Sequence, residues 1–231
     1  MKRILLKLSG EFLQGDQGVW SKDKVEVVVK QIEQLHAEGV EIAIVIGGGN
    51  IFRGGRNVFD FDRNEGDGIG MAATCVNALF LRACLQKCGL EVVICGKFLN
   101  GTDILNLDAK SLQKYLSGGQ IVIFSGGTGF AYFSTDTAAA LHAIEIKADV
   151  LLKGTKVDGV YDKDPKLYPD AKKFERLTYQ QVCDQRYEIM DASAFSLCRE
   201  QKMPIFIFNL EAKNAIYNAV YHEENGTFIQ E

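Results

Sequence analysis

Four short apolar runs in this 231-residue chain each end in a turn that contains glycine. The turns lie at 9–10, 47–50, 125–129 and 153–156. Glycine allows a backbone to approach a ligand closely, and the N–H groups of such turns can bind phosphate oxygens. One glycine turn after a strand usually serves only as a tight connection. Because the pattern recurs, it favours a phosphate-binding surface over unrelated turns.

Charged side chains beside these turns have the chemistry needed to handle phosphate groups. Lys7 could neutralise charge on a transferring phosphoryl group, although a strand lysine can also simply extend its charge into solvent. Arg53 follows the second turn and offers a planar donor for phosphate. Asp136 has two candidate roles, which are compatible: it stabilises the start of a helix, and it could orient Lys7 or hold Mg²⁺ through water.

The order of the glycines argues against two familiar nucleotide sites. The second turn reads Gly-Gly-Gly-Asn, which has neither the G-x-G-x-x-G order of dinucleotide folds nor the G-x-x-x-x-G-K-[ST] order of a P-loop. The third turn leads through hydroxyl and aromatic residues to a helix start at Asp136. Hydroxyls, N–H groups and a positive helix end suit a nucleotide phosphate, with the aromatic rings beside the base.

Strands alternate with helices along the chain. Apolar runs predict strands at 4–8, 41–46, 91–95, 120–124, 149–153 and 205–209. Helical spacing and N-cap residues predict helices between Ser21 and Gly39, over 71–88, after Asp108, over 135–148, after Thr178, after Asp191 and over 212–222. The stretches 56–68 and 155–173 are expected to be polar loops. The pattern predicts an α/β fold, a three-layer αβα sandwich around a mainly parallel sheet, with all four turns on the rim where ligands bind.

Composition narrows the function classes. A hydrophobic content of 47% is ample for one large domain or two small lobes. A net charge of -4 argues against broad binding to nucleic acid or to a membrane surface. The six cysteines lack C-x-x-C spacing and the three histidines lack a zinc-like arrangement, so we expect no metal site made by the protein and a cytoplasmic location. Lys7 and Ser9 cut the first apolar run short of a signal core, and no run is expected to span a bilayer.

Several spaced motifs together resemble one known family. They are Lys-Leu-Ser-Gly at 7–10, Ile-Gly-Gly-Gly-Asn-Ile-Phe-Arg-Gly at 46–54, Gly-Asp-Gly-Ile-Gly-Met at 66–71, Gly-Thr-Gly at 127–129, Lys-Gly-Thr-Lys-Val-Asp-Gly-Val-Tyr at 153–161 and Glu-Asn-Gly-Thr at 224–227. In that order they resemble the bacterial uridylate (UMP) kinases of the amino-acid kinase superfamily. The resemblance implies a single domain over 1–231, with an acceptor-side part over about 1–148 and an ATP-side part over about 149–231. It also implies transfer of the γ-phosphoryl group of ATP to UMP with Mg²⁺ and without a covalent enzyme intermediate, in a homohexamer.

The resemblance also assigns roles to matching residues. ATP is expected to bind at Lys7, Leu8, Ser9, Gly10, Gly49, Arg53, Lys153, Thr155, Tyr161 and Asp164. UMP is expected to bind at Gly48, Asp67, Thr128, Gly129, Phe130, Ala131, Tyr132, Phe133, Ser134 and Thr135. The residues expected to act in catalysis are Lys7, Arg53 and Asp136.

Ordinary structural roles also account for some of these residues. Asp67 lies in an acidic polar stretch that is typical of solvated surface. Tyr161 could pin its loop to the sheet, and Asp164 precedes a proline as turn-forming residues do. Asp191 is interpreted as a helix cap rather than a catalytic group.

The sequence departs from the family pattern at two places, and it is compatible with two alternative functions. Phe130 and Ala131 stand where the family commonly has Asn-Pro, so the acceptor loop could differ in shape or strictness. The segment 15–20 ends in Val-Trp rather than a glycine-like sequence, which puts activation by GTP in doubt. A related phosphotransferase acting on a carboxylate, carbamate or isopentenyl phosphate would share the rim, and a non-catalytic nucleotide sensor or storage protein would keep binding without turnover.

Overall fold

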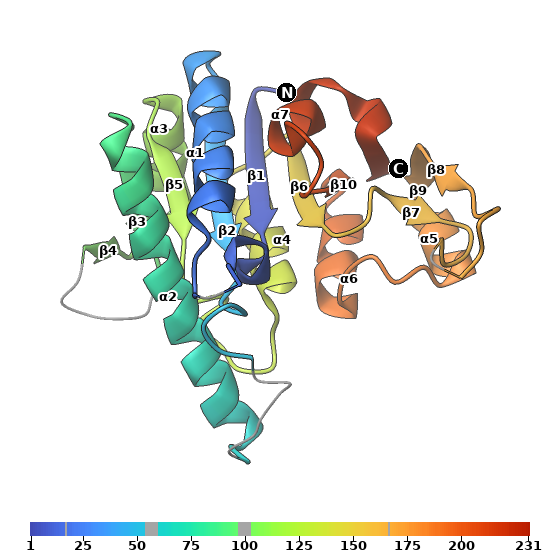
Figure 1. The fold of residues 1–231 in the computed structure, drawn as a ribbon, viewed down its shortest axis with the longest axis horizontal. Coiled ribbons are helices and arrows are strands. Elements are labelled where there is room, and N and C mark those ends of the chain that lie inside the picture. Colours follow the sequence, from blue (N-terminus) through green and yellow to red (C-terminus); the bar gives the residue numbers. More distant parts are fainter. Residues whose placement is uncertain (17, 54–59, 97–102, 166) are drawn as a thin grey trace.

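A nine-stranded sheet forms the centre of the computed structural model, which describes residues 1–16, 18–53, 60–96, 103–165 and 167–231. The strand order is β4-β3-β5-β2-β1-β6-β10-β11-β9 (Figure 1). The strands are β1 (Arg3–Leu8), β2 (Glu41–Ile46), β3 (Val92–Cys95), β4 (Ile104–Leu105), β5 (Ile121–Phe124), β6 (Val150–Thr155), β9 (Arg176–Thr178), β10 (Ile205–Asn209) and β11 (Gly226–Gln230). Neighbours run parallel except β10 and β11. The predicted mainly parallel sheet is confirmed.

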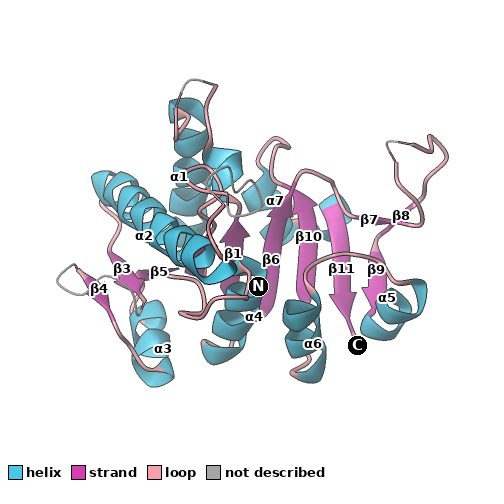
Figure 2. Ribbon diagram, turned by 90° about the horizontal axis from the view of Figure 1, so that it is seen from below, coloured by secondary structure: helices cyan, strands magenta, loops and turns pink. Residues whose placement is uncertain are grey.

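Helices cover both faces of this sheet (Figure 2). They are α1 (Lys22–Ala37), α2 (Arg63–Lys87), α3 (Ala109–Ser117), α4 (Thr135–Glu145), α5 (Tyr179–Gln185), α6 (Ala192–Glu200) and α7 (Ala215–Tyr221), with the 3₁₀ turns η1 (Gly10–Leu13) and η3 (Glu223–Asn225). One apolar core joins the sheet to α1, α2 and α7. A second joins it to α3, α4, α5 and α6. The predicted three-layer αβα arrangement is therefore confirmed.

The alternation of side chains along β1 decides where its lysine points. Ile4, Leu6 and Leu8 lie in the core beneath α1, whereas Leu5 lies in the opposite core beneath α4. Successive strand residues point to opposite faces, so Lys7 points to the same face as Leu5. The strand period therefore directs the ammonium group of Lys7 towards α4.

Helix α2 begins well before the predicted start at residue 71. Asp62 caps it with a capping box: the Asp62 side chain accepts from the backbone N–H of Glu65, and the Glu65 side chain accepts from that of Asp62. The expectation of a polar loop reaching residue 68 was wrong from Arg63 onward, because these caps outweigh the weak helix propensity of the three glycines at 66, 68 and 70. Consequently Asp67 lies on the first turns of a helix and not in a loop.

Two further segments differ from the expected layout. The predicted loop 155–173 contains β7 (Val160–Tyr161), which pairs antiparallel with β8 (Lys173–Phe174). Val160 is buried and its N–H donates to the Thr227 hydroxyl at 2.8 Å, so this loop has some core of its own. The closing strand β11 was not predicted, although it pairs along β10.

Helix α2 is also long and apolar enough to span a membrane by length and composition, contrary to the expectation from the sequence. Its buried side chains, among them Ala78, Leu81 and Leu85, pack in the core beside the sheet. The helix extends past the strand ends on the side where the glycine turns lie (Figure 1). It therefore brings its first turns beside the rim.

Candidate active site

The four strands that precede the glycine turns lie side by side in the order β5-β2-β1-β6. All of these pairs are parallel, so the turns emerge at one edge of the sheet, as predicted. The first two turns are in close contact there. A Cβ placed on Gly10 would lie 2.4 Å from the carbonyl oxygen of Gly47 and 2.5 Å from Oδ1 of Asn50, so only glycine fits at this position.

A pair of lysines and one aspartate form the centre of this rim. Lys7 and Lys153 are register partners on the adjacent parallel strands β1 and β6. Nζ of Lys7 lies 2.7 Å from Oδ1 of Asp136, and Nζ of Lys153 lies 2.5 Å from Oδ2. Lys153 also donates to the backbone carbonyl of Ile189 at 2.6 Å. The predicted contact between Asp136 and Lys7 is therefore present, and Lys153 shares the carboxylate.

The surroundings of this cluster fix its charge state. Burial opposes ionisation of Asp136, but the two ammonium groups outweigh it and hold the pKa of the carboxyl below its ordinary value. Burial lowers the pKa of Lys153 despite the opposing effect of Asp136. Asp136 lies in the first turn of α4, whose N-cap Ser134 accepts from the N–H groups of residues 136 and 137. The helix start thus orients a carboxylate that remains ionised at neutral pH.

Arg53 is held by an acidic residue that the sequence did not single out. Its Nε donates to Oε1 of Glu11 at 2.5 Å, and a second guanidinium nitrogen forms an ion pair with the same oxygen. The hydrogen bond and charge of Glu11 raise the pKa of Arg53. The Glu11 side chain lies against Gly49, since a Cβ there would be 3.0 Å from its Oε1. The structure thereby brings Arg53 to the second turn.

The third turn is tied to α2. The N–H of Gly126 donates to Oγ1 of Thr74 at 2.8 Å, and Gly126 adopts a positive φ of 77°. The following loop reaches back to the same helix: the N–H of Tyr132 donates to Oδ2 of Asp67 at 2.7 Å, and Nε of Arg63 donates to that oxygen at 2.9 Å. Asp67 therefore contacts the expected acceptor loop although 65 residues separate it from Tyr132.

Most residues expected to bind UMP gather around two adjoining cavities. The smaller, of about 140 Å³, is lined in part by Gly48, Asp67, Phe133 and Thr135. The larger, of about 560 Å³, is lined in part by Thr128, Gly129, Phe130 and Phe133. Both include Gly127, so they meet at the third turn. Of the others, Tyr132 binds Asp67 through its backbone, Ser134 caps α4, and Ala131 is half-buried in the same loop.

Residues expected to bind ATP divide between the rim and a third cavity. Lys153, Thr155, Tyr161 and Asp164 line a cavity of about 710 Å³ at the fourth turn. Lys7, Ser9, Gly10, Gly49 and Arg53 lie at or beside the first two turns. The Leu8 side chain is fully buried in the core, so only its backbone can meet a ligand. Lys153 lines the third cavity and is the register partner of Lys7, so the two groups of expected residues meet at this pair of lysines.

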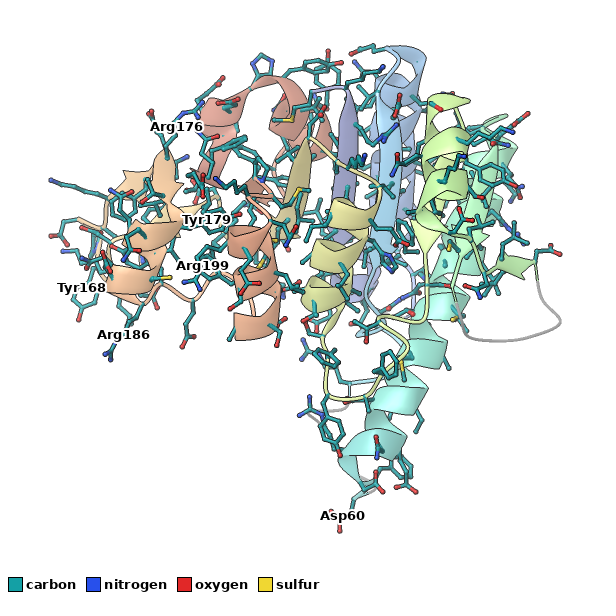
Figure 3. All side chains as sticks on the ribbon, turned by 180° about the vertical axis from the view of Figure 1, so that it is seen from behind. Asp60, Tyr168, Arg176, Tyr179, Arg186 and Arg199 are labelled. Atoms are coloured by element: carbon teal, nitrogen blue, oxygen red, sulfur yellow. The ribbon has the colours of Figure 1, made fainter. Side chains whose placement is uncertain are left out.

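The fourth-turn cavity also contains groups that the sequence did not suggest. Arg186 lines it from the C-terminal end of α5. In Figure 3, Arg186 lies on the side of the molecule where Tyr168 lies, whereas Asp60 lies at the far end, beside the start of α2. The hydroxyl of Tyr161 donates to Oδ1 of Asp158 at 2.7 Å, and burial together with this carboxylate raises the pKa of Tyr161 to about 12. This bond joins two residues of the same loop, whereas the structural interpretation of Tyr161 expected a contact between the loop and the sheet.

Asp191 is a helix cap, as predicted, and also joins two helices. Its Oδ1 accepts from the N–H of Ala194 at 3.0 Å and from Oγ1 of Thr137 at 2.9 Å. Its Oδ2 accepts from the hydroxyl of Ser134. The carboxylate therefore connects the start of α6 to the start of α4. Other residues missed from the sequence are Glu11, Thr74 and Asn77, whose partners are distant along the chain.

Comparisons with known proteins cover the whole chain. Residues 2–209 match the amino acid kinase family. Uridylate kinases from Pseudomonas paraeruginosa and Pseudomonas aeruginosa are each 45% identical over 234 residues, covering 100% of this chain and 95% of each relative. The crystal structure of UMP kinase from Ureaplasma parvum matches with a TM-score of 0.94 at 34% identity, covering 100% of this chain and 99% of the other. Uridylate kinase from Archaeoglobus fulgidus matches with a TM-score of 0.76 at 28% identity, covering 99% and 100%.

Proposed function

The chain belongs to the amino acid kinase family, with full-length uridylate kinases among its relatives, and from this membership we propose how its residues transfer the γ-phosphoryl group of ATP to UMP. The enzyme is a nucleoside monophosphate kinase that makes UDP and ADP. The observation that carries the proposal is the cluster of Lys7, Asp136 and Lys153. It lies on the rim between the adjoining cavities of the third turn, here called the acceptor cavities, and the fourth-turn cavity.

The lysines stabilise the charge of the transferring group. Donor and acceptor phosphates repel each other, and an ammonium group held in place offsets this repulsion without reorganising during the reaction. Asp136 keeps Lys7 and Lys153 in position and offsets their mutual repulsion. It has no need to act as a base, because the phosphate of UMP is largely doubly ionised at neutral pH and an oxygen of it can attack directly. Direct attack requires no covalent enzyme intermediate.

Arg53 is assigned to the phosphates near the second turn. The guanidinium lies beside Gly49 through its ion pair with Glu11. A planar fork of donors suits bidentate binding of phosphate oxygens. Glu11 would hold this fork in place before substrate arrives.

UMP is assigned to the adjoining cavities of the third turn. The phosphate lies towards Gly48 and Thr135, the ribose beside Asp67, and the base against the loop 128–133. Both bonds to Asp67 described above use Oδ2, so we assign Oδ1 to the ribose hydroxyl groups. The adenosine half of ATP is assigned to the fourth-turn cavity with Thr155, Tyr161 and Asp164.

A kinase that uses ATP needs a divalent metal, and we propose Mg²⁺. Among the described residues, no group of three or more acidic, histidine or cysteine side chains is arranged to hold a metal ion. Mg²⁺ does not require a cluster of protein ligands, because it is commonly bound by one or two carboxylates, water and substrate phosphates. Asp136 would hold it through water, and the ion would neutralise charge on the phosphates when bound.

The assembly, location and domain limits are proposals that follow from the family. We propose a homohexamer of a single domain over 1–231, in the cytoplasm, with the acceptor-side part over about 1–148 and the ATP-side part over about 149–231. A stripe along α2 supports self-association, because Ile69 and Val76 are exposed, apolar and seven residues apart, and therefore lie on one face of the helix. Neither nucleic acid nor a membrane is proposed as a partner.

An assay of ADP release tests the function and the substrate assignment together. UMP, CMP, dCMP, glutamate, aspartate and carbamate are compared as acceptors at equal ATP and Mg²⁺. We expect the highest kcat/KM with UMP. Turnover with an amino acid or carbamate exceeding that with UMP would contradict the proposal, and ATP binding without any turnover would indicate a nucleotide sensor instead.

A further inference from the structure

Asn77 is a buried amide within an apolar part of α2. Its side chain has no exposed surface, and the nearby Ala78 and Leu81 belong to the apolar core. Burying an amide is unfavourable unless its hydrogen-bonding groups have partners. Burial of the Asn77 amide therefore requires hydrogen-bond partners for its side chain.

Each polar atom of the Asn77 side chain has two partners. Nδ2 donates to the carbonyl oxygen of Gly47 and to Oδ1 of Asn50, both at 2.7 Å. Oδ1 accepts from Nδ2 of Asn50 at 3.1 Å and from Nε1 of Trp20 at 2.9 Å. The Trp20 ring is itself fixed by stacking on Phe80 at 4.0 Å between centroids. The amide thus joins α2 to the second glycine turn.

The two atoms that accept hydrogen bonds from Asn77 also determine how closely the first glycine turn can approach the second. These are the Gly47 carbonyl oxygen and Asn50 Oδ1, the same atoms that would meet a Cβ on Gly10 at 2.4 and 2.5 Å. Gly10 follows Lys7 by three residues, on the turn after β1. The position of Asn77 therefore limits how closely the two turns approach each other.

We propose that Asn77 is a positioning residue for phosphoryl transfer, which fixes the second glycine turn relative to the turn that follows Lys7. The inference rests on the proposed assignment of these turns to the substrate phosphates. Asn77 itself touches no substrate. Because a shift of about 1 Å in a reacting group can lower a rate about a hundredfold, kcat is the quantity most sensitive to its loss.

The test compares Asn77→Ala with Leu85→Ala, a buried residue of α2 in the same core. Both truncations should lower the melting temperature. In the folded protein, Asn77→Ala should lower kcat about 10- to 100-fold, with KM for ATP and UMP changed less than about threefold. Hydrogen exchange over 47–53 should increase in Asn77→Ala. Leu85→Ala should keep kcat within about twofold and leave that exchange unchanged.

Asn77→Leu separates hydrogen bonding from space filling. Leucine fills much of the same space, but it can neither donate to Gly47 and Asn50 nor accept from Trp20. We expect its kcat to be as low as that of Asn77→Ala. Recovery of kcat to within about twofold of the unmodified enzyme would indicate a packing role and overturn the proposal.

Further outcomes are decisive for the positioning role. A folded Asn77→Ala with kcat within about twofold of the unmodified enzyme overturns it. If Asn77→Ala does not fold, Asn50→Ala takes its place, and a kcat loss of at least about fivefold supports the proposal whereas a smaller loss overturns it. Lys7→Ala, assayed in parallel, tests the site itself, and full turnover in that variant contradicts the site assignment. If Lys7→Ala loses turnover while Asn77→Ala remains fully active, only the role of Asn77 is refuted.

Discussion

Lys7 is the residue whose removal should affect chemistry most directly. Its ammonium group is held 2.7 Å from Asp136 at the end of β1, beside its register partner Lys153. Lys7→Ala should lower kcat about 10²- to 10³-fold, with KM for UMP changed less than about threefold, because the charge acts mainly on the transferring group. Lys2→Ala, an exposed change just before the same strand, is the matched control and should leave both constants unchanged. Weaker UMP binding with unchanged kcat would contradict the assigned role of Lys7.

Asp67 should act on UMP and not on ATP. Asp67→Asn removes the charge that strengthens a bond to a ribose hydroxyl, so KM for UMP should rise about tenfold while KM for ATP stays within about twofold. Steady-state kinetics with each substrate varied in turn measures both constants. Asp60→Asn, an exposed change just before α2, should have no effect on either. A larger change in KM for ATP than for UMP would show that the two sites have been assigned in reverse.

Asp136 should give the enzyme a characteristic dependence of stability on pH. Its pKa in the folded protein lies below the unfolded value, so its stabilising effect is full above about pH 5 and is lost as the pH falls through the lowered pKa. Asp136→Asn also leaves protonated Lys153 buried without its partner, a penalty that diminishes as the pH rises towards the unfolded pKa of lysine. The variant should thus lose about 3 kcal/mol near neutral pH and less at either extreme.

Urea unfolding of the unmodified protein and Asp136→Asn at about pH 3, 7 and 9 measures this difference, the lowest pH being below the unfolded pKa of aspartate. Glu145→Gln, near the other end of α4, controls for a general change in charge on this helix. A loss of stability that is the same at all three pH values would mean that ionisation of this cluster does not stabilise the fold.

The residues that could be predicted from the sequence are those next to a recognisable turn. Lys7, Asp136 and Lys153 each flank a strand or helix end, so the strand period and sheet edge suffice to bring them together. Glu11 and Thr74 have no such marker, since their roles depend on partners 42 and 52 residues away. Asn77 had one available signal, an amide within an otherwise apolar helical run.

At the scale of elements, the start of α2 was predicted too late, because the glycines in its first turns hide the capping residues. The glycines at 66, 68 and 70 made the start of α2 resemble a loop, whereas Asp62 and Glu65 supply the capping box that begins it. The error matters for function because it placed Asp67 in solvated loop. On the helix, Asp67 is presented to the acceptor loop at a fixed distance.

Asp191 offers a test of how two elements are held together. Asp191→Ala removes the N-cap of α6 and the bonds to Ser134 and Thr137 on α4, so it should lower the free energy of unfolding by about 2 kcal/mol. Asp108→Ala is the matched control: Asp108 caps α3, which is nine residues long like α6, and its side chain accepts from the N–H of Ser111. Equal losses in urea unfolding would mean that the link between α4 and α6 contributes nothing beyond the cap.

At the scale of the whole molecule, alternation of strands and helices was enough to predict the layers and the common rim. It could not give the strand order, because β6 lies beside β1 although their sequences are far apart. The antiparallel β11 also escaped prediction, since its pairing with β10 depends on the whole sheet being assembled. The division into acceptor and fourth-turn cavities on either side of Lys7 follows from this order, as β1 lies between β2 and β6.

The exposed stripe of α2 makes the proposed assembly testable. Two apolar side chains, Ile69 and Val76, are 39% and 43% exposed on one face of a long helix, and burying them between subunits would remove apolar area from water. Val76→Glu should therefore shift the sedimentation coefficient from that of a hexamer to that of a smaller species, because a carboxylate in an apolar contact is strongly unfavourable. Gln86→Glu, an exposed change on the same helix, should sediment like the unmodified protein. A monomer without any substitution would refute the hexamer, and a Val76→Glu hexamer would place the interface away from this stripe.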